Sequence, residues 1–270
     1  ARAREAGAPD TTPAQRGLQA TVRFVAHLLV LLLAQATHVQ STCVSQLSVG
    51  VSHSCAVLED GNVQCWGRGS SGQLGYGNTA SVFLPSAAGV VSAGGTVVQV
   101  STGFDHTCAL LVGGLVRCWG SGGSGKLGYG NGDSIGDDEL PSSVGTVSIG
   151  GTGSAVFVGW HHSCVIFVDG GVRCWGSGFW GRLGSGNTNM IGDNELPSSV
   201  ATVSFGGTAV SGSAGPNNVC LLLSDGAVRC WGAGLYGTNG LGVTTDLGDD
   251  EAPSSVSPID LGGSATVVST

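Results

Sequence analysis

Short apolar runs separated by glycine-rich stretches recur along most of the chain. In the first example, CAVL (55–58) and VQCW (63–66) flank the turn residues Glu59-Asp60-Gly61. Apolar runs of this length are typical of β-strands, and a glycine at the third position of a three-residue hairpin loop supplies the positive φ that the loop needs. A further strand-like run, VVQVSTG (97–103) in the second unit, precedes each hairpin. Because no segment outside the amino-terminal apolar run has a helical period, the pattern predicts an all-β protein.

The predicted hairpin belongs to a unit that occurs four times. The copies begin at residues 52, 105, 161 and 217, which places them 53, 56 and 56 residues apart, and each carries a CWG or CWG-like strand followed by a glycine-rich loop. Internal repeats of this length indicate a repeat architecture in which each copy is one supersecondary unit. We therefore divide the chain into a leader and four repeats, the last of which ends with the first strand of a fifth unit. The predicted boundaries are 1–36, 37–99, 100–155, 156–211 and 212–270.

The nine cysteines follow the repeat. Eight of them form four pairs with nine residues between the members of each pair, and the hairpin register places the two members opposite each other. Directly opposed residues of a non-hydrogen-bonded pair lie close enough for a disulfide. The sequence thus predicts four disulfides within the repeats, with Cys43 left free or paired with another chain. The predicted pairs are Cys55–Cys65, Cys108–Cys118, Cys164–Cys174 and Cys220–Cys230.

The amino-terminal segment resembles a secretory signal peptide. Arg23 precedes an apolar run from Phe24 to Leu33, and Ala34-Gln35-Ala36 has the small-x-small pattern of a cleavage site. The run is too short to span a bilayer, and a buried hydrophobic helix is the alternative. A signal peptide and paired cysteines both predict a secreted or cell-surface protein whose only membrane contact is transient.

Composition and charge exclude some partners. The 49 glycines have no three-residue period, and 41% of the residues are apolar, which favours a packed core with glycine at turns. Residues 1–36 hold four of the ten basic and two of the eighteen acidic residues, so residues 37–270 keep six basic and sixteen acidic side chains, a net charge of −10. A surface this acidic repels phosphate backbones, so no nucleic-acid partner is expected.

A dinucleotide-like glycine pattern, Gly120-x-Gly122-x-x-Gly125, follows the second hairpin. A phosphate-binding loop must open a helix, and the Leu-Gly-Tyr-Gly-Asn that follows would not continue as one. The same pattern occurs in all four copies, with Gln73, Arg182 or Thr238 at the position of Lys126. The glycines therefore mark a turn, and we expect neither nucleotide binding nor any cofactor.

At this point the copies resemble the repeat of the regulator of chromosome condensation family. The first copy carries the family's features at His53, Asp60-Gly61, Val63, Trp66-Gly67 and Gly72-Gln73-Leu74-Gly75. The resemblance covers about residues 43–270 and implies four-stranded blades arranged radially, which typically close as a ring of seven. It implies a β-propeller-type fold of four blade units of about 53–56 residues, partial or open unless further chain completes it. The paired cysteines suit a secreted variant, and the acidity opposes the nuclear exchange-factor role that one member has.

Two groups of residues suggest metal binding. His53, His106 and His162 share one repeat position, but they come from successive blades and are interpreted as structural, since zinc needs converging ligands. Acidic triplets precede a proline in three connectors and are weak calcium candidates, with a solvated acidic turn as the alternative. These candidates are Asp137, Asp138, Glu139, Asp193, Glu195, Asp249, Asp250 and Glu251. Because neither group carries a firm site, no metal is predicted.

The tryptophans separate into two classes. Trp66, Trp119, Trp175 and Trp231 recur in every repeat and are predicted to be core residues. Trp160 and Trp180 are not repeated, so together with Phe179 they are predicted to form an exposed contact patch.

No catalytic constellation accompanies these residues, so the protein is not predicted to be an enzyme; a secreted hydrolase would need converging carboxylates that the sequence does not place. The favoured function is a non-catalytic extracellular scaffold that binds a protein partner. The alternatives are a subunit of an extracellular filament that self-associates through open blade edges, and a secreted inhibitor or lectin-like binder.

Overall fold

The computed structural model describes residues 43–269 as four antiparallel sheets of three strands each, here called blades 1 to 4. The leader and signal peptide predicted at 1–36 lie outside the described residues. No helix in the described part of the chain is long and apolar enough to cross a membrane. The strands are β1 (Val44–Val49), β2 (His53–Leu58), β3 (Val63–Gly67), β4 (Val97–Thr102), β5 (His106–Leu111), β6 (Leu115–Gly120), β7 (Gly153–Val158), β8 (His162–Phe167), β9 (Val172–Gly176), β10 (Ala209–Ala214), β11 (Asn218–Leu223) and β12 (Val228–Gly232).

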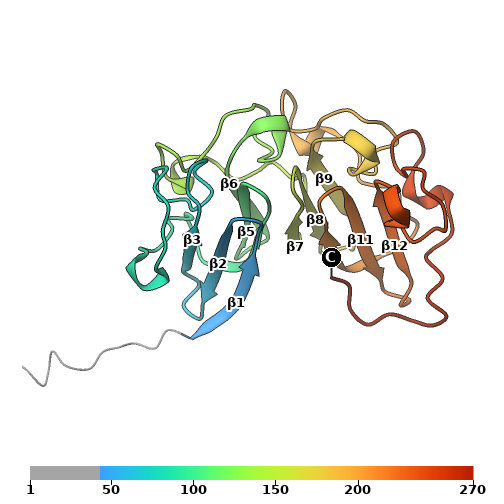
Figure 1. The fold of residues 1–270 in the computed structure, drawn as a ribbon, viewed down its shortest axis with the longest axis horizontal. Coiled ribbons are helices and arrows are strands. Elements are labelled where there is room, and N and C mark those ends of the chain that lie inside the picture. Colours follow the sequence, from blue (N-terminus) through green and yellow to red (C-terminus); the bar gives the residue numbers. More distant parts are fainter. Residues whose placement is uncertain (1–42, 270) are drawn as a thin grey trace, which may run out of the picture. The chain divides into compact units, whose positions relative to one another are not determined.

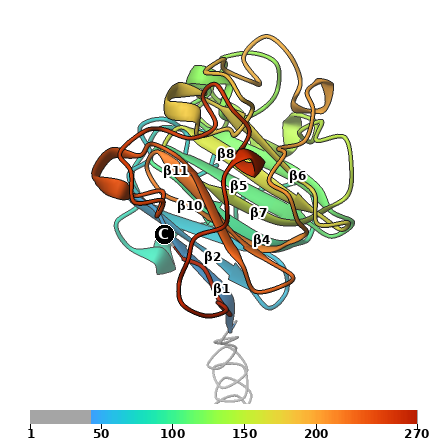
Figure 2. The same ribbon diagram turned by 90° about the vertical axis from the view of Figure 1, so that its right-hand side faces the viewer.

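The blades follow one another in chain order, from β1–β3 in blue to β10–β12 in orange (Figure 1). The first strands of successive blades are in contact: β1 with β4, β4 with β7 and β7 with β10. The Gln46 side chain shows how this contact is made, because it accepts a hydrogen bond from the Val100 N–H at 2.7 Å and donates one to the Val100 carbonyl at 2.9 Å. Viewed along the row of blades, the labelled strands overlap in projection and run in similar directions (Figure 2).

The hairpins have the register that the sequence predicts. Cys55 lies opposite Cys65, and the Leu58 N–H donates to the Asn62 carbonyl across the three-residue loop. Gly61 closes this loop at a φ of +79°, a left-handed conformation that glycine adopts without steric cost. Each of the four hairpins carries its disulfide, and Cys43 is free and exposed.

The sheets have three strands, whereas the family resemblance implied four. The fourth position along β6 is taken by two isolated bridges from the connector, at Gly120–Ile135 and Val116–Val147. Between the bridges, the Tyr129 hydroxyl bonds both the N–H and the carbonyl of Cys118, at 3.3 and 3.2 Å. A side chain thus replaces the middle of the fourth strand, so the connector does not run as a continuous strand there.

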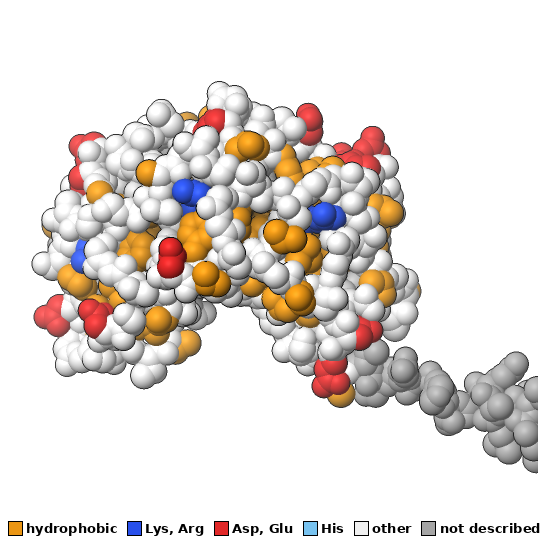
Figure 3. Space-filling view, turned by 180° about the vertical axis from the view of Figure 1, so that it is seen from behind, with side chains coloured by type: hydrophobic (Ala, Val, Ile, Leu, Met, Phe, Trp, Pro, Cys, Tyr) orange, Lys and Arg blue, Asp and Glu red, His pale blue; other side chains and the backbone are white. Residues whose placement is uncertain are grey.

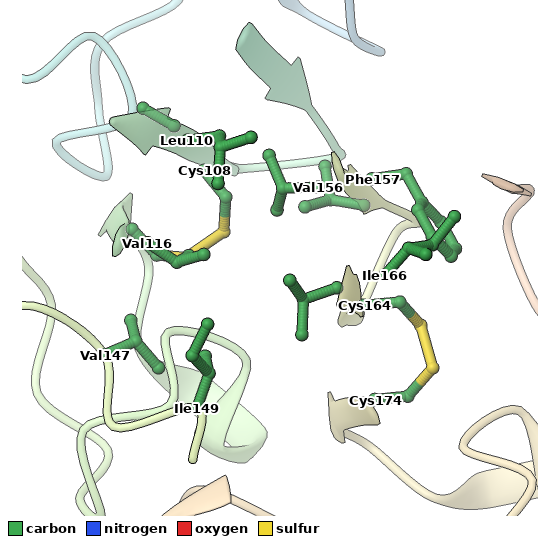
Figure 4. Packing of buried hydrophobic residues seen from close by; sticks show 14 of the residues in the cluster. Cys108, Leu110, Val116, Val147, Ile149, Val156, Phe157, Cys164, Ile166 and Cys174 are labelled. Carbon is green, nitrogen blue, oxygen red and sulfur yellow. A yellow bond between two sulfur atoms is a disulfide. The ribbon is translucent and has the colours of Figure 1, made fainter. Parts of the chain in front are cut away.

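The core runs through all four blades. Val156 of β7 lies between the disulfide-bearing hairpins β5–β6 and β8–β9 (Figure 4). Trp119, Trp175 and Trp231 are fully buried, whereas Trp66 of blade 1 is only half-buried because no blade precedes it in the described chain. The all-β, propeller-type fold predicted from the repeats is therefore confirmed for the described residues.

Two details of the predicted repeat limits differ from the structure. The boundaries at 99/100, 155/156 and 211/212 fall inside β4, β7 and β10, because the run that precedes each hairpin already pairs with it. The first strand of a fifth unit does not form: residues 261–269 contain no strand. Ala265 still donates to the Gly226 carbonyl as Ala209 does to that of Gly170.

Candidate functional site

Several exposed aromatic side chains lie in the glycine loops that follow the third strands of blades 3 and 4. Short 3₁₀ turns η4 (Phe179–Gly181) and η6 (Leu235–Gly237) present the pairs Phe179–Trp180 and Leu235–Tyr236 to solvent. Blades 1 and 2 have Ser70-Ser71 and Gly123-Ser124 at these positions. Among the four glycine loops, large apolar pairs therefore occur only in those of blades 3 and 4, while the connector of blade 1 carries another exposed pair, Phe83–Leu84.

Trp180 and Tyr236 have the left-handed backbone conformation, with φ of 60° and 59°, and so has Ser124 at the same position of blade 2, with φ of 62°. This conformation costs a residue with a Cβ about 1–2 kcal/mol, and its occurrence at Ser124 shows that it belongs to the turn of the repeat. Arg182 supports the first pair: its Nε donates to the Phe179 carbonyl at 2.9 Å, and its guanidinium lies 4.9 Å from the Trp180 ring centre. The loop geometry thus holds Trp180 outward instead of allowing it to fold onto the blade.

The structure separates the predicted contact patch into two parts. Phe179 and Trp180 lie together, with ring centres 6.4 Å apart, whereas Trp160 packs on Phe104 at 5.6 Å. Because His162 pairs with Gly176, the turn before β8 and the loop after β9 lie at the same end of blade 3, so both parts face the same side. Phe104 and the pair Leu235–Tyr236 were missed from the sequence. The pair Leu235–Tyr236 could have been found by aligning the four copies, because it stands at the positions of Phe179–Trp180.

The acidic turns lie where successive blades meet. The Gly136 carbonyl accepts a hydrogen bond from Asn78 of the preceding repeat at 3.1 Å, and Gly192 and Gly248 accept equivalent bonds from Gly130 and Gly186. The turns therefore join the blades through their backbone. The connector of blade 1 (79–96) lacks the triplet, and no blade precedes blade 1 in the described chain.

The carboxylates of two acidic turns lie close together. The oxygens of Asp137, Asp138 and Glu139 can come within 4.8 Å of one another, as can those of Asp249, Asp250 and Glu251. The turn with Asp193 and Glu195 has an amide, Asn194, between them. Partial burial, together with the neighbouring aspartates, raises the pKa of Glu139 and of Glu251. These carboxylates stay weak calcium candidates, because exposed acidic groups commonly form such clusters without an ion.

The repeated histidines point into the seams between blades. His53 Nε2 lies 2.8 Å from the Thr107 hydroxyl, and His106 Nε2 lies 3.0 Å from the Ser163 hydroxyl of the next blade. Val219 takes the equivalent position in blade 4, so His162 has no hydroxyl to bond. Burial lowers the pKa of His53 to about 4 and that of His162 to about 3. The three side chains serve separate seams, which agrees with their structural interpretation.

In blades 1 to 3, the carbonyl of the residue after the last glycine of the GxGxxG pattern accepts a hydrogen bond from the tryptophan of the next blade. Trp119 Nε1 donates to the Gln73 carbonyl at 3.0 Å, and Thr107 donates to the same oxygen at 2.9 Å. Trp175 binds the Lys126 carbonyl in the same way at 3.0 Å. The lysine that gave the loop its nucleotide-like pattern pairs with Asp105 at 2.8 Å and is buried. The loops are thus occupied by the neighbouring blade.

Known proteins with this repeat share both the sequence and the blade geometry. Residues 44–73, 97–126 and 209–238 match the description "Regulator of chromosome condensation (RCC1) repeat", and residues 60–110 match a second description of the same repeat. The matched segments are RCC1 repeats. The third copy, with its hairpin β8–β9 and glycine loop, has the same structure as its matched neighbours.

Relatives of the chain are longer than the chain itself. It is 32% identical to the ultraviolet-B receptor UVR8 of Arabidopsis thaliana over 204 residues, which are 75% of this chain and 44% of that protein. Human WBSCR16 superposes with a TM-score of 0.62 at 23% identity, covering 77% of this chain and 51% of that one. Prp20p of Saccharomyces cerevisiae gives a TM-score of 0.62 at 19% identity, covering 78% and 50%. The chain therefore spans about half the length of these proteins.

Proposed function

We propose that this RCC1-repeat protein is a non-catalytic, extracellular interaction scaffold that binds a protein partner through the aromatic loops of blades 3 and 4. The observation that carries the proposal is the exposed aromatic pair Phe179–Trp180, presented by the glycine loop of blade 3. One face of the described unit also has apolar side chains gathered over its middle with few charges among them (Figure 3). The published structure of Prp20p is described with that protein's binding properties to Gsp1p and histones, which supports a protein partner. Four disulfides support an oxidising compartment.

The surroundings of the pair favour a partner with basic side chains. A Cβ on Gly181 would touch the backbone nitrogen of Asp249, so the Trp180 loop lies directly against the acidic turn of blade 4. Aromatic faces attract guanidinium and ammonium groups, and carboxylates beside them add to this attraction. An arginine or lysine of a partner can therefore stack on the aromatic pair and face the carboxylates of Asp249, Asp250 and Glu251.

Panning a displayed peptide library on the full chain tests this proposal. We expect enrichment of peptides with arginine or lysine, and we expect the double variant F179S/W180S, which restores the serines of blade 1, to lose that enrichment. V168S is the matched control, because Val168 is an exposed apolar residue at the opposite, hairpin end of blade 3. Equal enrichment on F179S/W180S and the native chain would contradict the proposal.

A second candidate function is self-assembly through the open side of blade 1. Leu47 and Val49 are 57% and 70% exposed, whereas Val100 and Thr102, at the same positions of blade 2, are 1% and 7% exposed against the preceding blade. An uncovered blade face of this kind can pair with another chain and give head-to-tail contacts.

Sedimentation velocity over a range of concentrations tests self-assembly. The native chain is expected to form larger species as concentration rises, and the variant L47Q/V49T to stay monomeric. V98S serves as the control, since Val98 is exposed on β4 away from the open side. A native chain that stays monomeric at every concentration removes this candidate.

A further inference from the structure

One position of the repeat changes in a way that opens a cavity in blade 3. Tyr76 and Tyr129 follow the Gln-Leu-Gly of blade 1 and the Lys-Leu-Gly of blade 2, and Ser185 takes the same place in blade 3. A cavity of about 970 Å³ lies there, lined by Cys174, Ser185 and residues of the connector up to Ala201 and Val203. We refer to it as the blade-3 cavity. Its volume is within the range of small-molecule sites.

In blades 1 and 2 the tyrosine side chain fills this space. The Tyr76 hydroxyl receives the Cys65 N–H at 3.0 Å and lies 2.9 Å from the Cys65 carbonyl and 3.1 Å from that of Gly89. Tyr129 makes the equivalent pair of bonds to Cys118. Cys174 and Ala201, which occupy the positions of Cys65 and Gly89, both line the blade-3 cavity. The cavity is therefore the counterpart of a tyrosine-binding space.

The backbone of Cys174 is oriented as in the tyrosine-filled blades. Cys174 pairs with Cys164 at a Cα–Cα distance of 4.1 Å, which is the spacing of a non-hydrogen-bonded pair. Its N–H and carbonyl therefore point away from β8, toward the connector. The connector bonds the residues on either side, with Val203 donating to Val172 and Ile191 bridging Gly176, but it leaves position 174 between them. A hydroxyl placed there can donate and accept as the tyrosine hydroxyl does.

The rest of the lining defines the ligand further. Leu183, Ile191 and Val203 supply apolar surface for a ring, while Asp193 and Glu195 supply negative charge, and no basic residue lines the cavity. Burial of a tyrosine at this repeat position raises the pKa of Tyr129 to about 12, so the space favours an un-ionised hydroxyl. The carboxylates attract a positive group at the other end of the ligand.

We infer that the blade-3 cavity is a binding site for a phenol that carries a positive charge, with the phenol hydroxyl bonded to the Cys174 backbone in the place that Tyr129 fills in blade 2. The source of the ring is either a free aromatic amine or the side chain of a partner's tyrosine next to a basic residue. The site is separate from the aromatic loops, so it stands or falls independently of the proposed scaffold function.

Calorimetry on the full chain with a series of probes tests the site. Tyramine is expected to bind saturably, and phenethylamine, which lacks the hydroxyl, to bind about tenfold more weakly because two hydrogen bonds are lost. The anion 4-hydroxyphenylacetate is expected to bind more weakly than tyramine. A peptide Gly-Tyr-Arg-Gly compared with Gly-Phe-Arg-Gly distinguishes the sources: preference for the tyrosine peptide over tyramine indicates a partner's side chain, and the reverse indicates a free amine.

Two variants assign the binding to the cavity. S185Y is expected to abolish tyramine binding, since the new side chain occupies the space, and to retain or raise the melting temperature. L241Y places a tyrosine at the same position of blade 4 and is expected to leave tyramine affinity unchanged. The inference is overturned if neither tyramine nor the tyrosine peptide binds saturably up to about 10 mM, a limit weaker than ordinary small-ligand affinities, or if S185Y binds as the native chain does.

Discussion

Acidification from pH 7 to pH 5 is expected to reduce the free energy of unfolding on the order of 4–6 kcal/mol, because three buried histidines resist protonation. In the unfolded chain a histidine takes up its proton near pH 6.5, whereas in the folded chain His53 does so near pH 4 and His162 near pH 3. Burial also lowers the pKa of His106, well below 6.5. Between pH 6.5 and these lower values only the unfolded chain binds the protons, so stability is present above pH 6.5 and is lost as the pH falls.

The charged groups that face each histidine raise or lower its pKa further. Asp105 partly offsets the effect of burial on the pKa of His53. Lys126 and the neighbouring histidines lower the pKa of His106 further, and Arg182 and His161 do the same for His162. The strongest resistance to protonation is therefore in seams 2–3 and 3–4.

Denaturant unfolding at pH 7 and pH 5 measures the effect. The variant H162N, which copies Asn218 of blade 4, is expected to lose about one third of the pH dependence, since one of three similar histidines is removed. If the free energy of unfolding fell by the same amount between pH 7 and pH 5 in H162N and in the native chain, groups other than His162 would be responsible for the pH dependence. A native chain equally stable at both pH values would contradict the role of all three.

The parts of the fold that depend on nearby residues could be predicted from the sequence. The hairpin and its disulfide follow from nine intervening residues and one loop glycine, because register across a short loop is fixed locally. The glycine loop differs from a phosphate-binding loop in sequence, since the Lys126 position varies between copies. The burial of the repeated tryptophans followed from their recurrence, although Trp66 shows that a core position also needs a neighbouring blade.

Contacts between repeats could not be predicted from residues that are near one another in the sequence. The acidic triplets were singled out for their carboxylates, as weak calcium candidates. In the structure it is the backbone of these turns that joins the blades, as in the hydrogen bond from the Asn78 N–H to the Gly136 carbonyl. Tyr129 is 11 residues from Cys118 and replaces a strand there, which no alternation of apolar and polar residues indicates. The contact patch was predicted as one group, but Trp160 has Phe104 as its partner, and Phe104 comes from another blade. Such pairings depend on how blades are placed next to each other.

The joint between the blades is expected to depend on the glycines at the third position of the GxGxxG pattern. Gly125 has a φ of +70°, and a Cβ there would overlap the backbone nitrogen of Asp193 and lie 2.9 Å from the Ile191 carbonyl oxygen. The alanine variant G125A must therefore separate the acidic turn of blade 3 from the loop of blade 2. Backbone strain and overpacking together are expected to lower the free energy of unfolding by about 3 kcal/mol or more.

Two further alanine variants separate the cost of backbone strain from the cost of losing the contact between the glycine loop and the acidic turn of the next blade. Gly237 has nearly the same φ, +73°, but nothing lies within 4 Å of its Cβ position, so G237A carries the strain alone and is expected to cost about 1–2 kcal/mol. Gly123 lies in the same loop as Gly125 with only the Ser121 hydroxyl near, at 3.8 Å, so G123A is expected to stay within about 0.5 kcal/mol of the native chain. Hydrogen exchange at the Gly130 N–H, which bonds Gly192 across the same joint, should accelerate in G125A and not in the other two. If G125A and G237A were equally destabilised and exchange at Gly130 did not change, the loop glycines would serve only the local turn, and the docking of the acidic turns would contribute nothing measurable to holding the blades together.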